Sequence, residues 1–333
     1  MPTPNSGDTE RVGTGRERAG GDGAHEPGGE FDAVARIGAE LADPALRPRP
    51  GETWMGDDTA VLDPPRGRML FTVDAVVAGV HVDLRLASPA DAGYKAMVAS
   101  LSDIAAMGGR PCHAVAAVAG PPDTDLVGLA RGMKEAAVGF GCPLVGGNLS
   151  QAGVLSVTIA VTGEVAEGPP PVPRSGSRPG DALCVTGALG ASAAGLRLLR
   201  TGASGPAALV DAHRRPRPHL AEGETARLAG AHAMIDVSDG LAADLGRLAD
   251  ASGVGFNLDH LPVADGATDD EALGGGEDYV LVVAVADPDA LAAAFSARGL
   301  EPPLQLGRCV ADPAERTLHG ETIVGGWEHD FRN

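Results

Sequence analysis

Apolar residues recur at helical spacing in several segments of the chain, and short apolar runs separate these segments. Phe31, Val34, Ile37 and Leu41 stand three or four positions apart, which predicts an amphipathic helix. The same spacing, ended by glycine in several cases, predicts further helices over residues 89–109, 125–141, 190–200, 240–252 and 288–299.

The apolar runs between these segments are typical of strands. We expect strands over residues 59–63, 68–77, 113–120, 143–148, 154–165, 182–187, 231–235 and 276–285. Strands and helices mix along the whole chain, so the predicted fold class is α/β or α+β, in two lobes.

Composition changes at two places and suggests the domain boundaries. Residues 1–29 are rich in glycine, proline and charge, so we expect a disordered tail there. Residues 168–181 are rich in proline and predict a connection between domains. A length of 333 residues fits two domains, which we assign to 30–168 and 175–333.

The charge balance bears on possible partners. Lys and Arg number 26 and Asp and Glu number 45, which gives a net charge of −19. Such a chain repels a phosphate backbone, so we expect no nucleic-acid partner. Phosphorylated small molecules remain possible when cations mediate the contact.

Cysteine usage and hydropathy bear on the compartment. The four cysteines form no C-x-x-C pair, and neither a membrane-length apolar run nor a signal-peptide core is present. We therefore expect a cytoplasmic protein without a membrane partner.

Five aspartates lie at expected strand ends, beside glycine or inside an apolar helix, and these are Asp58, Asp74, Asp103, Asp236 and Asp239. Burying several carboxylates without partners is costly, and few basic residues lie nearby in sequence. Mg²⁺ favours carboxylate and phosphate oxygens. The pattern therefore predicts a site for several metal ions that assists phosphoryl transfer. No Walker A motif is present.

The stretch "MIDVSDGLAADLG" at 234–246 allows two interpretations. Ser238 and Asp239 stand just before an expected helix, where such side chains commonly cap the first turn. Three oxygen-bearing side chains in four residues, those of Asp236, Ser238 and Asp239, exceed what one cap needs, so we expect that they also bind metal or phosphate.

Seven motifs occur in one order along the chain: "GDDTAVL", "VDAVVAGVH", "GYKAMVASLSDIAAMGGRP", "LVGGN", "RSGSRPGDALCVTG", "MIDVSDGLAADLG" and "GGGEDY". This set resembles the thiamine-monophosphate kinase family, which shares a superfamily with aminoimidazole ribonucleotide synthetase and selenophosphate synthetase. The resemblance implies ATP-dependent phosphorylation of thiamine monophosphate to thiamine diphosphate, with several Mg²⁺ ions. It also implies an N-terminal lobe with a mixed sheet that binds ATP and metal and pairs across a homodimer, and a C-terminal α/β lobe.

The resemblance also assigns roles to individual residues. The implied metal ligands are Asp58, Thr72, Asp74, Asp103, Asp236 and Asp239. The implied ATP contacts are Gly147, Asn148, Arg174 and Ser238. The implied substrate contacts are His81, Glu277 and Trp327. Tyr94 and Lys95 are expected to be packing or surface residues rather than catalytic ones.

Three positions depart from the family pattern. Asn148 stands where the family usually has an aspartate ligand, which predicts weaker binding of one Mg²⁺. Val73 replaces a hydroxyl residue in the same expected metal neighbourhood, and Gly274 replaces a serine. These departures leave two alternatives open: a related enzyme that phosphorylates another small acceptor, or a non-catalytic nucleotide-binding homologue.

Overall fold

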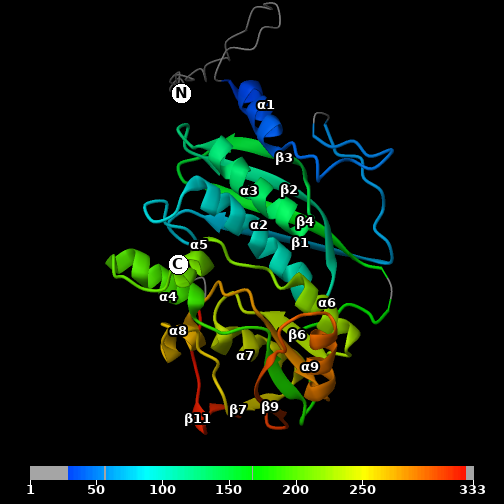
Figure 1. The fold of residues 1–333 in the computed structure, drawn as a ribbon, viewed down its shortest axis with the longest axis vertical. Helices are drawn as coiled ribbons and strands as arrows, with labels where there is room; N and C mark the ends of the chain where they lie inside the picture. Colours follow the sequence, from blue (N-terminus) through cyan, green and yellow to red (C-terminus); the bar gives the residue numbers. More distant parts are fainter. Residues whose placement is uncertain (1–28, 56–57, 167, 328–333) are drawn as a thin grey trace, which may run out of the picture.

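The computed structural model describes residues 29–55, 58–166 and 168–327. It contains two mixed sheets with helices packed on them, which confirms the predicted α/β class (Figure 1). The predicted disordered tail lies outside the described residues except for Gly29, the N-cap of the first helix. None of the helices in the described ranges has both the length and the hydropathy to cross a membrane.

The first sheet lies in the N-terminal half and has the strand order β1-β4-β2-β3. Strands β2 and β3 are parallel, and the other neighbours are antiparallel. The elements of this half are α1 (Glu30–Leu41), β1 (Arg68–Val77), α2 (Pro89–Ala106), β2 (Arg110–Gly120), α3 (Leu126–Phe140), β3 (Leu144–Gln151) and β4 (Ser156–Val165).

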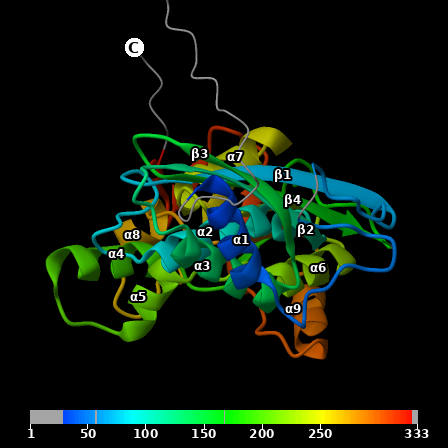
Figure 2. The same cartoon turned by 90° about the horizontal axis from the view of Figure 1, so that it is seen from above.

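The two faces of this sheet differ in burial. Helices α2 and α3 pack on one face and bury a core that includes Met97, Leu101 and Ile159 (Figure 2). Along β1 side chains alternate between the faces, as strand geometry requires. Consequently Phe71 and Val73 stand on the other face, where they are 68% and 57% exposed.

The second sheet has the strand order β11-β10-β7-β9-β5-β8-β6. Only β10 and β7 pair in parallel among its described neighbours. The elements of this half are β5 (Ala182–Val185), α4 (Ala191–Thr201), α5 (Ala207–Arg214), α6 (Leu220–Leu228), β6 (Ala233–Asp236), α7 (Leu241–Ser252), β7 (Gly255–Leu258), α8 (Asp269–Gly274), β8 (Leu281–Val285), α9 (Pro288–Ala297), β9 (Leu304–Val310), β10 (Arg316–Leu318) and β11 (Glu321–Thr322).

Both faces of the second sheet are covered. Leu183 and Val185 of β5 face one core with α7, whereas Ala182 and Cys184 face another core that contains Phe295 of α9. Because both faces are buried, β5, β6 and β8 are apolar almost throughout, which explains why they appear as continuous apolar runs in the sequence.

Helix α2 belongs to both halves of the molecule. Its N-terminus is fixed by a capping box between Ser88 and Asp91, and most of its length packs on the first sheet. Its last turn, Ala105 and Ala106, enters a core of the second sheet. Gly223 permits this approach, because a Cβ there would lie less than 3.0 Å from the carbonyl oxygen of Ala105. The helix therefore fixes one sheet relative to the other.

Two expected strands differ from the structure. Residues 59–63 form only an isolated bridge between Thr53 and Val61 instead of a strand. The strand expected over 276–285 begins at Leu281, because Glu277 and Tyr279 have φ values of 65° and 53°, which interrupt an extended chain. The domain limits assigned above remain a proposal, with one sheet on each side of the proline-rich connection.

Candidate active site

A cavity of about 570 Å³ lies between the two halves of the molecule. Its walls come from β1, α2, α4, the β6–α7 turn, the loop after α8 and the C-terminal segment. Nine of the residues assigned from the sequence line it, namely Asp74, His81, Asp103, Arg174, Asp236, Ser238, Asp239, Glu277 and Trp327.

Four aspartates from both halves of the chain face one end of this cavity. Asp74 and Asp103 belong to β1 and α2, and Asp236 and Asp239 belong to the end of β6 and the turn after it. The hydroxyl of Ser102 donates to Oδ2 of Asp236 at 2.7 Å, across the boundary between the halves.

The charges in this cluster perturb one another. Burial, and then the neighbouring Asp103 carboxylate, raise the pKa of Asp74 to about 6. Burial, and then the same Asp103, raise the pKa of Asp236 to about 7. Thr72 joins the cluster indirectly, since its hydroxyl donates to Asp103 Oδ2. The cluster therefore contains negative charge that the surrounding side chains do not fully compensate.

The turn before α7 is ordered by the helix itself. The N-cap of α7 is Gly240, with φ 105° and no side-chain cap, so the expected capping by Ser238 and Asp239 is wrong. Instead Asp244, inside the helix, accepts hydrogen bonds from the backbone N–H groups of Ser238 at 3.0 Å and Asp239 at 2.9 Å. Arg247 pairs with both Asp239 and Asp244. This arrangement leaves the Ser238 hydroxyl uninvolved in capping.

The chemistry of the aspartate cluster fits a hard cation. No three His, Cys, Asp or Glu side chains of the described ranges already converge on one point as a closed metal site. Mg²⁺ is commonly held by one or two carboxylates together with substrate phosphates, so it does not need such a cage. The four aspartates line an open cavity and offer such carboxylates, and substrate phosphates can supply the other oxygen ligands.

Aromatic side chains also line the cavity. The rings of His81 and Trp327 meet edge to face with centroids 6.1 Å apart. The backbone N–H of Trp327 donates to the carbonyl oxygen of Asp239 at 2.9 Å, which anchors the C-terminal segment beside α7. Gly326 makes this possible, because its φ is +98° and a Cβ there would lie less than 3.0 Å from the Cβ of Ala243.

The loop after α8 directs two adjacent carboxylates in opposite ways. Glu277 lines the cavity, and its N–H donates to the carbonyl oxygen of Ser238 at 2.8 Å. Asp278 instead accepts hydrogen bonds from the N–H groups of Gly190 and Ser192 and so caps α4. Asp278 is therefore a structural residue, and Glu277 is the member of the pair that reaches the cavity.

Lys95 is buried and paired with a residue of the cavity. Its Nζ lies 2.7 Å from Glu277 Oε2, and its side chain is only 3% exposed. Burial excludes the surface position for Lys95 and agrees with the packing position that was also expected. Tyr94 does pack, against Phe140 and under the guanidinium of Arg215. One sequence signal was available: the chain has only two lysines, and the other is Lys134.

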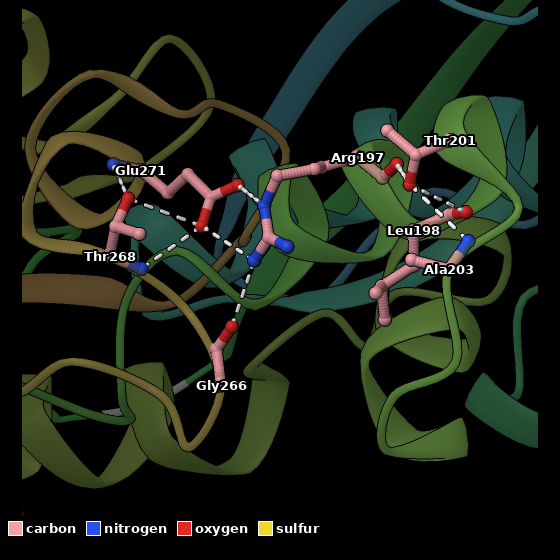
Figure 3. A network of polar contacts seen from close by, with 7 residues as sticks. All are labelled: Arg197, Leu198, Thr201, Ala203, Gly266, Thr268 and Glu271. Atoms are coloured by element: carbon pink, nitrogen blue, oxygen red, sulfur yellow. Dashed lines mark hydrogen bonds and ion pairs between the residues drawn. The ribbon is translucent and has the colours of Figure 1, made fainter.

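Helices α4 and α8, which form one wall of the cavity, are joined by a polar network (Figure 3). Arg197 of α4 pairs with Glu271 at 2.7 Å and also donates to the carbonyl oxygen of Gly266. Glu271 in turn forms a capping box with Thr268 at the start of α8. The network holds the loop that contains Glu277 against α4.

The remaining assigned residues lie elsewhere in the chain. Asp58 is exposed and does not line the cavity. Gly147 and Asn148 line a separate apolar groove beside α1. Close packing against β2 explains why glycine stands at position 147, since a Cβ there would lie less than 3.0 Å from the carbonyl oxygen of Ala116. Val73 points away from the face of β1 that presents Asp74, so its replacement alters the exposed sheet face instead of the aspartate cluster.

Comparison with known proteins gives consistent matches over most of the chain. The family "AIR synthase related protein, N-terminal domain" matches residues 56–165, and its C-terminal domain counterpart matches residues 178–319. Thiamine-monophosphate kinase of Mycobacterium tuberculosis strain H37Rv is 35% identical over 321 residues, which are 90% of this chain and 91% of that protein.

Solved structures give the same result. Thiamine-monophosphate kinase from Stenotrophomonas maltophilia K279a has a TM-score of 0.75 and 32% identity, covering 88% of this chain and 98% of that chain. AaThiL complexed with AMPPCP and TMP has a TM-score of 0.71 and 30% identity, covering 91% and 97%. With its two AIR synthase related domains, the chain belongs to the thiamine-monophosphate kinase family.

Proposed function

We propose that this protein transfers the γ-phosphoryl group of ATP to thiamine monophosphate and releases thiamine diphosphate and ADP. An oxygen of the acceptor phosphate bonds to the γ-phosphorus. The bond between that phosphorus and the bridging oxygen breaks, and ADP leaves with the electron pair. The observation that supports this reaction best is one cavity between the two halves of the chain that is lined both by carboxylates and by aromatic side chains.

The relatives support the choice of substrates. The curated relatives with about 35% identity are named thiamine-monophosphate kinase, and a structural relative binds AMPPCP and TMP together. The lining of the cavity agrees with two ligands, because His81 and Trp327 can contact an aromatic acceptor while Arg174 and Ser238 can contact phosphate groups.

At the phosphate end, Asp74, Asp103, Asp236 and Asp239 would hold Mg²⁺. When bound, Mg²⁺ neutralises phosphate charge and aligns the reacting groups. Asp58, Thr72, Gly147 and Asn148 keep their proposed roles in metal and nucleotide binding, although none of them lines this cavity. The chain's own contribution is positioning, which is the larger part of catalysis in phosphoryl transfer.

We further propose that the protein is a homodimer through the exposed face of the first sheet. Met69, Phe71 and Val73 of β1 and Val115 of β2 are 59%, 68%, 57% and 41% exposed on this side. A contiguous apolar patch of this kind is typical of a protein interface. A second copy of the same face would cover it.

The direct test is to incubate the purified protein with MgATP and thiamine monophosphate and to measure thiamine diphosphate by chromatography. Asp236→Asn is expected to lose at least about 100-fold in kcat, because it removes a charged ligand from the phosphate end. Asp123→Asn, an exposed aspartate of the β2–α3 loop, is the matched control and should keep wild-type activity.

Each result separates the remaining alternatives. Tight binding of ATP without turnover would favour a non-catalytic nucleotide-binding protein. Turnover of ATP only with other acceptors would favour a related enzyme of different specificity. Asn148→Asp tests the departure from the family pattern at this position of β3. It should lower the Mg²⁺ concentration that gives half-maximal activity, and an unchanged concentration would exclude Asn148 from the metal site.

A further inference from the structure

The ion pair between Lys95 and Glu277 joins the two halves of the protein inside the active-site region. Lys95 lies on α2, which packs on the first sheet, and Glu277 lies in the loop that precedes β8 of the second sheet. The distance between Nζ and Oε2 is 2.7 Å, with the lysine side chain 3% exposed and the glutamate side chain 23% exposed.

Lys95 shares a helix face with residues that line the cavity. Lys95, Ala99 and Asp103 stand four positions apart, so they lie along one side of α2. Ala99 and Asp103 both line the cavity. The same side of α2 therefore supplies the Asp103 carboxylate to the cavity lining and the Lys95 ammonium group to Glu277, another lining residue.

Both described side-chain contacts of the Glu277 carboxylate, with Lys95 and His213, are made through Oε2, so Oε1 takes part in none of them. Of the hydrogen bonds between described side chains, the only one that this carboxylate accepts is that from Lys95, at Oε2. His213 also lies near, 3.7 Å from Oε2, but burial and the nearby Lys95, Arg200 and Arg214 lower its pKa to about 3. Lys95 is thus the positive charge that neutralises Glu277 at neutral pH.

The backbone of the loop gives Glu277 a fixed starting point. Its φ is 65°, an uncommon value for a residue with a side chain, and its N–H is bonded to the carbonyl oxygen of Ser238. Gly276 permits this contact, since a Cβ there would lie less than 3.0 Å from the same oxygen. The backbone fixes where the glutamate begins, and Lys95 fixes where its carboxylate ends.

We propose that Lys95 is a positioning residue that determines acceptor binding, holding Oε2 of Glu277 so that Oε1 accepts a hydrogen bond from an N–H group of the acceptor ring. Because the pair has no net charge, it favours a neutral N–H donor over a second cation. The inference rests on the proposed function, in which the acceptor is thiamine monophosphate, whose pyrimidine bears an exocyclic amine.

The kinetic test compares three variants. Lys95→Met should raise KM for thiamine monophosphate by about 10- to 100-fold, the size expected for one hydrogen bond to a charged group. Its kcat and its KM for ATP should stay within about threefold of wild type, because the described hydrogen bond and ion pair of Lys95 go to Glu277 and not to the aspartates of the cluster. Lys95→Arg should restore part of the affinity. The control is Lys134→Met, which removes the other lysine of the chain. Lys134 lies on α3 and pairs with Asp43, so its replacement should change neither kcat nor the two KM values.

A second acceptor tests the hydrogen bond directly. Replacing the exocyclic amine of thiamine monophosphate by a carbonyl oxygen removes the proposed donor. The wild-type enzyme should discriminate against this analogue, and Glu277→Gln, whose amide can rotate to donate, should lose most of the discrimination. Equal KM values for both acceptors in the wild type would overturn the proposal.

A measurement on the unmodified protein covers the case in which the variants fold poorly. Selective ¹³C labelling of lysine gives two Cε resonances, since the chain has two lysines, and Lys134→Met assigns them. Thiamine monophosphate should shift the Lys95 signal, whereas ATP alone should not. A Lys95 signal unmoved by a bound acceptor refutes the inference. If the wild type neither binds nor phosphorylates thiamine monophosphate, the proposed function fails as well.

Discussion

Replacing Gly326 with alanine tests how the C-terminal segment places Trp327 at the cavity. In the structure Gly326 has φ +98°, and a Cβ would lie less than 3.0 Å from the Cβ of Ala243 and 3.1 Å from the carbonyl oxygen of Asp239. Ordinary carbon–carbon contact is about 3.5–4.0 Å, so the segment must move away from α7 by roughly 1 Å or more.

The cost of this movement follows from two losses. A side chain in left-handed backbone costs about 1–2 kcal/mol. The hydrogen bond from the backbone N–H of Trp327 to Asp239, which is 2.9 Å long, breaks when the segment moves, and such a bond contributes about 1 kcal/mol. A total of about 2–3 kcal/mol reduces the equilibrium constant for docking of the segment roughly 30- to 150-fold.

Steady-state kinetics measure the effect. On the proposal that Trp327 contacts the acceptor, Gly326→Ala should raise KM for thiamine monophosphate as the docked population falls and leave KM for ATP nearly unchanged. Gly320→Ala is the control, because Gly320 has φ +82° but no atom lies within 4 Å of the position that a Cβ would take. A wild-type KM for the acceptor in Gly326→Ala would refute the docking argument, and an equal rise in Gly320→Ala would assign the effect to backbone strain alone.

Three further changes address assembly, pH and the cavity wall. Phe71→Asp places a charge on the exposed sheet face and should convert the proposed dimer to a monomer, measured by light scattering. His213→Asn should reduce destabilisation by acid. The pKa of His213 is about 3 in the folded protein against 6.5 in the unfolded chain, so its contribution to stability is fully present above about pH 6.5. That contribution is lost as the pH decreases towards 3, by up to about 1.4 kcal/mol per pH unit. Arg197→Ala removes the ion pair with Glu271 and should lower the free energy of unfolding, measured by thermal unfolding. The loss should be no more than about 1 kcal/mol, because solvent screens this partly exposed pair.

Each of these changes has a control or a contradicting result. Val154→Asp, at another exposed apolar residue, should leave the dimer intact, and a monomeric wild type would contradict the interface. Denaturation curves with the same pH dependence in His213→Asn and wild type would exclude His213 as the titrating group. Strict additivity of Arg197→Ala and Glu271→Ala would mean that their contact contributes nothing.

Much of the fold was predictable because its elements obey simple periodicities. Strand β1 was predicted at its observed limits, Arg68–Val77, and α7 ends at Gly253 in the left-handed conformation, as its sequence indicated. The strand expected at residues 59–63 failed because an apolar run with a single partner bridge does not form a ladder. Periodicity describes a segment and does not reveal whether a neighbouring strand is available.

The site was predictable in part, for a different reason. Asp74, Asp236 and Glu277 stand in distinctive motifs, and the fold brings them to one cavity. The ion pair of Lys95 was not predicted because its partner Glu277 lies 182 positions away, and a lysine next to a tyrosine in a helix has no local signature. The expected capping by Ser238 failed because the helix begins later, at Leu241 with Gly240 as its N-cap, and Asp244 inside the helix orders the preceding turn through the N–H groups of Ser238 and Asp239. Long-range pairing of side chains is the information that a local pattern lacks.

The division of the four aspartates between the two halves has a consequence for how the protein responds to its ionic environment. Asp74 and Asp103 belong to one half and Asp236 and Asp239 to the other, so their mutual repulsion opposes docking of the halves. On the proposed function, a cation bound between them reverses the sign of that contribution. By linkage, a ligand at 100 times its Kd adds about 2.7 kcal/mol to folding stability. The free Mg²⁺ concentration would then determine the resistance of the enzyme to heat and proteolysis as well as its rate.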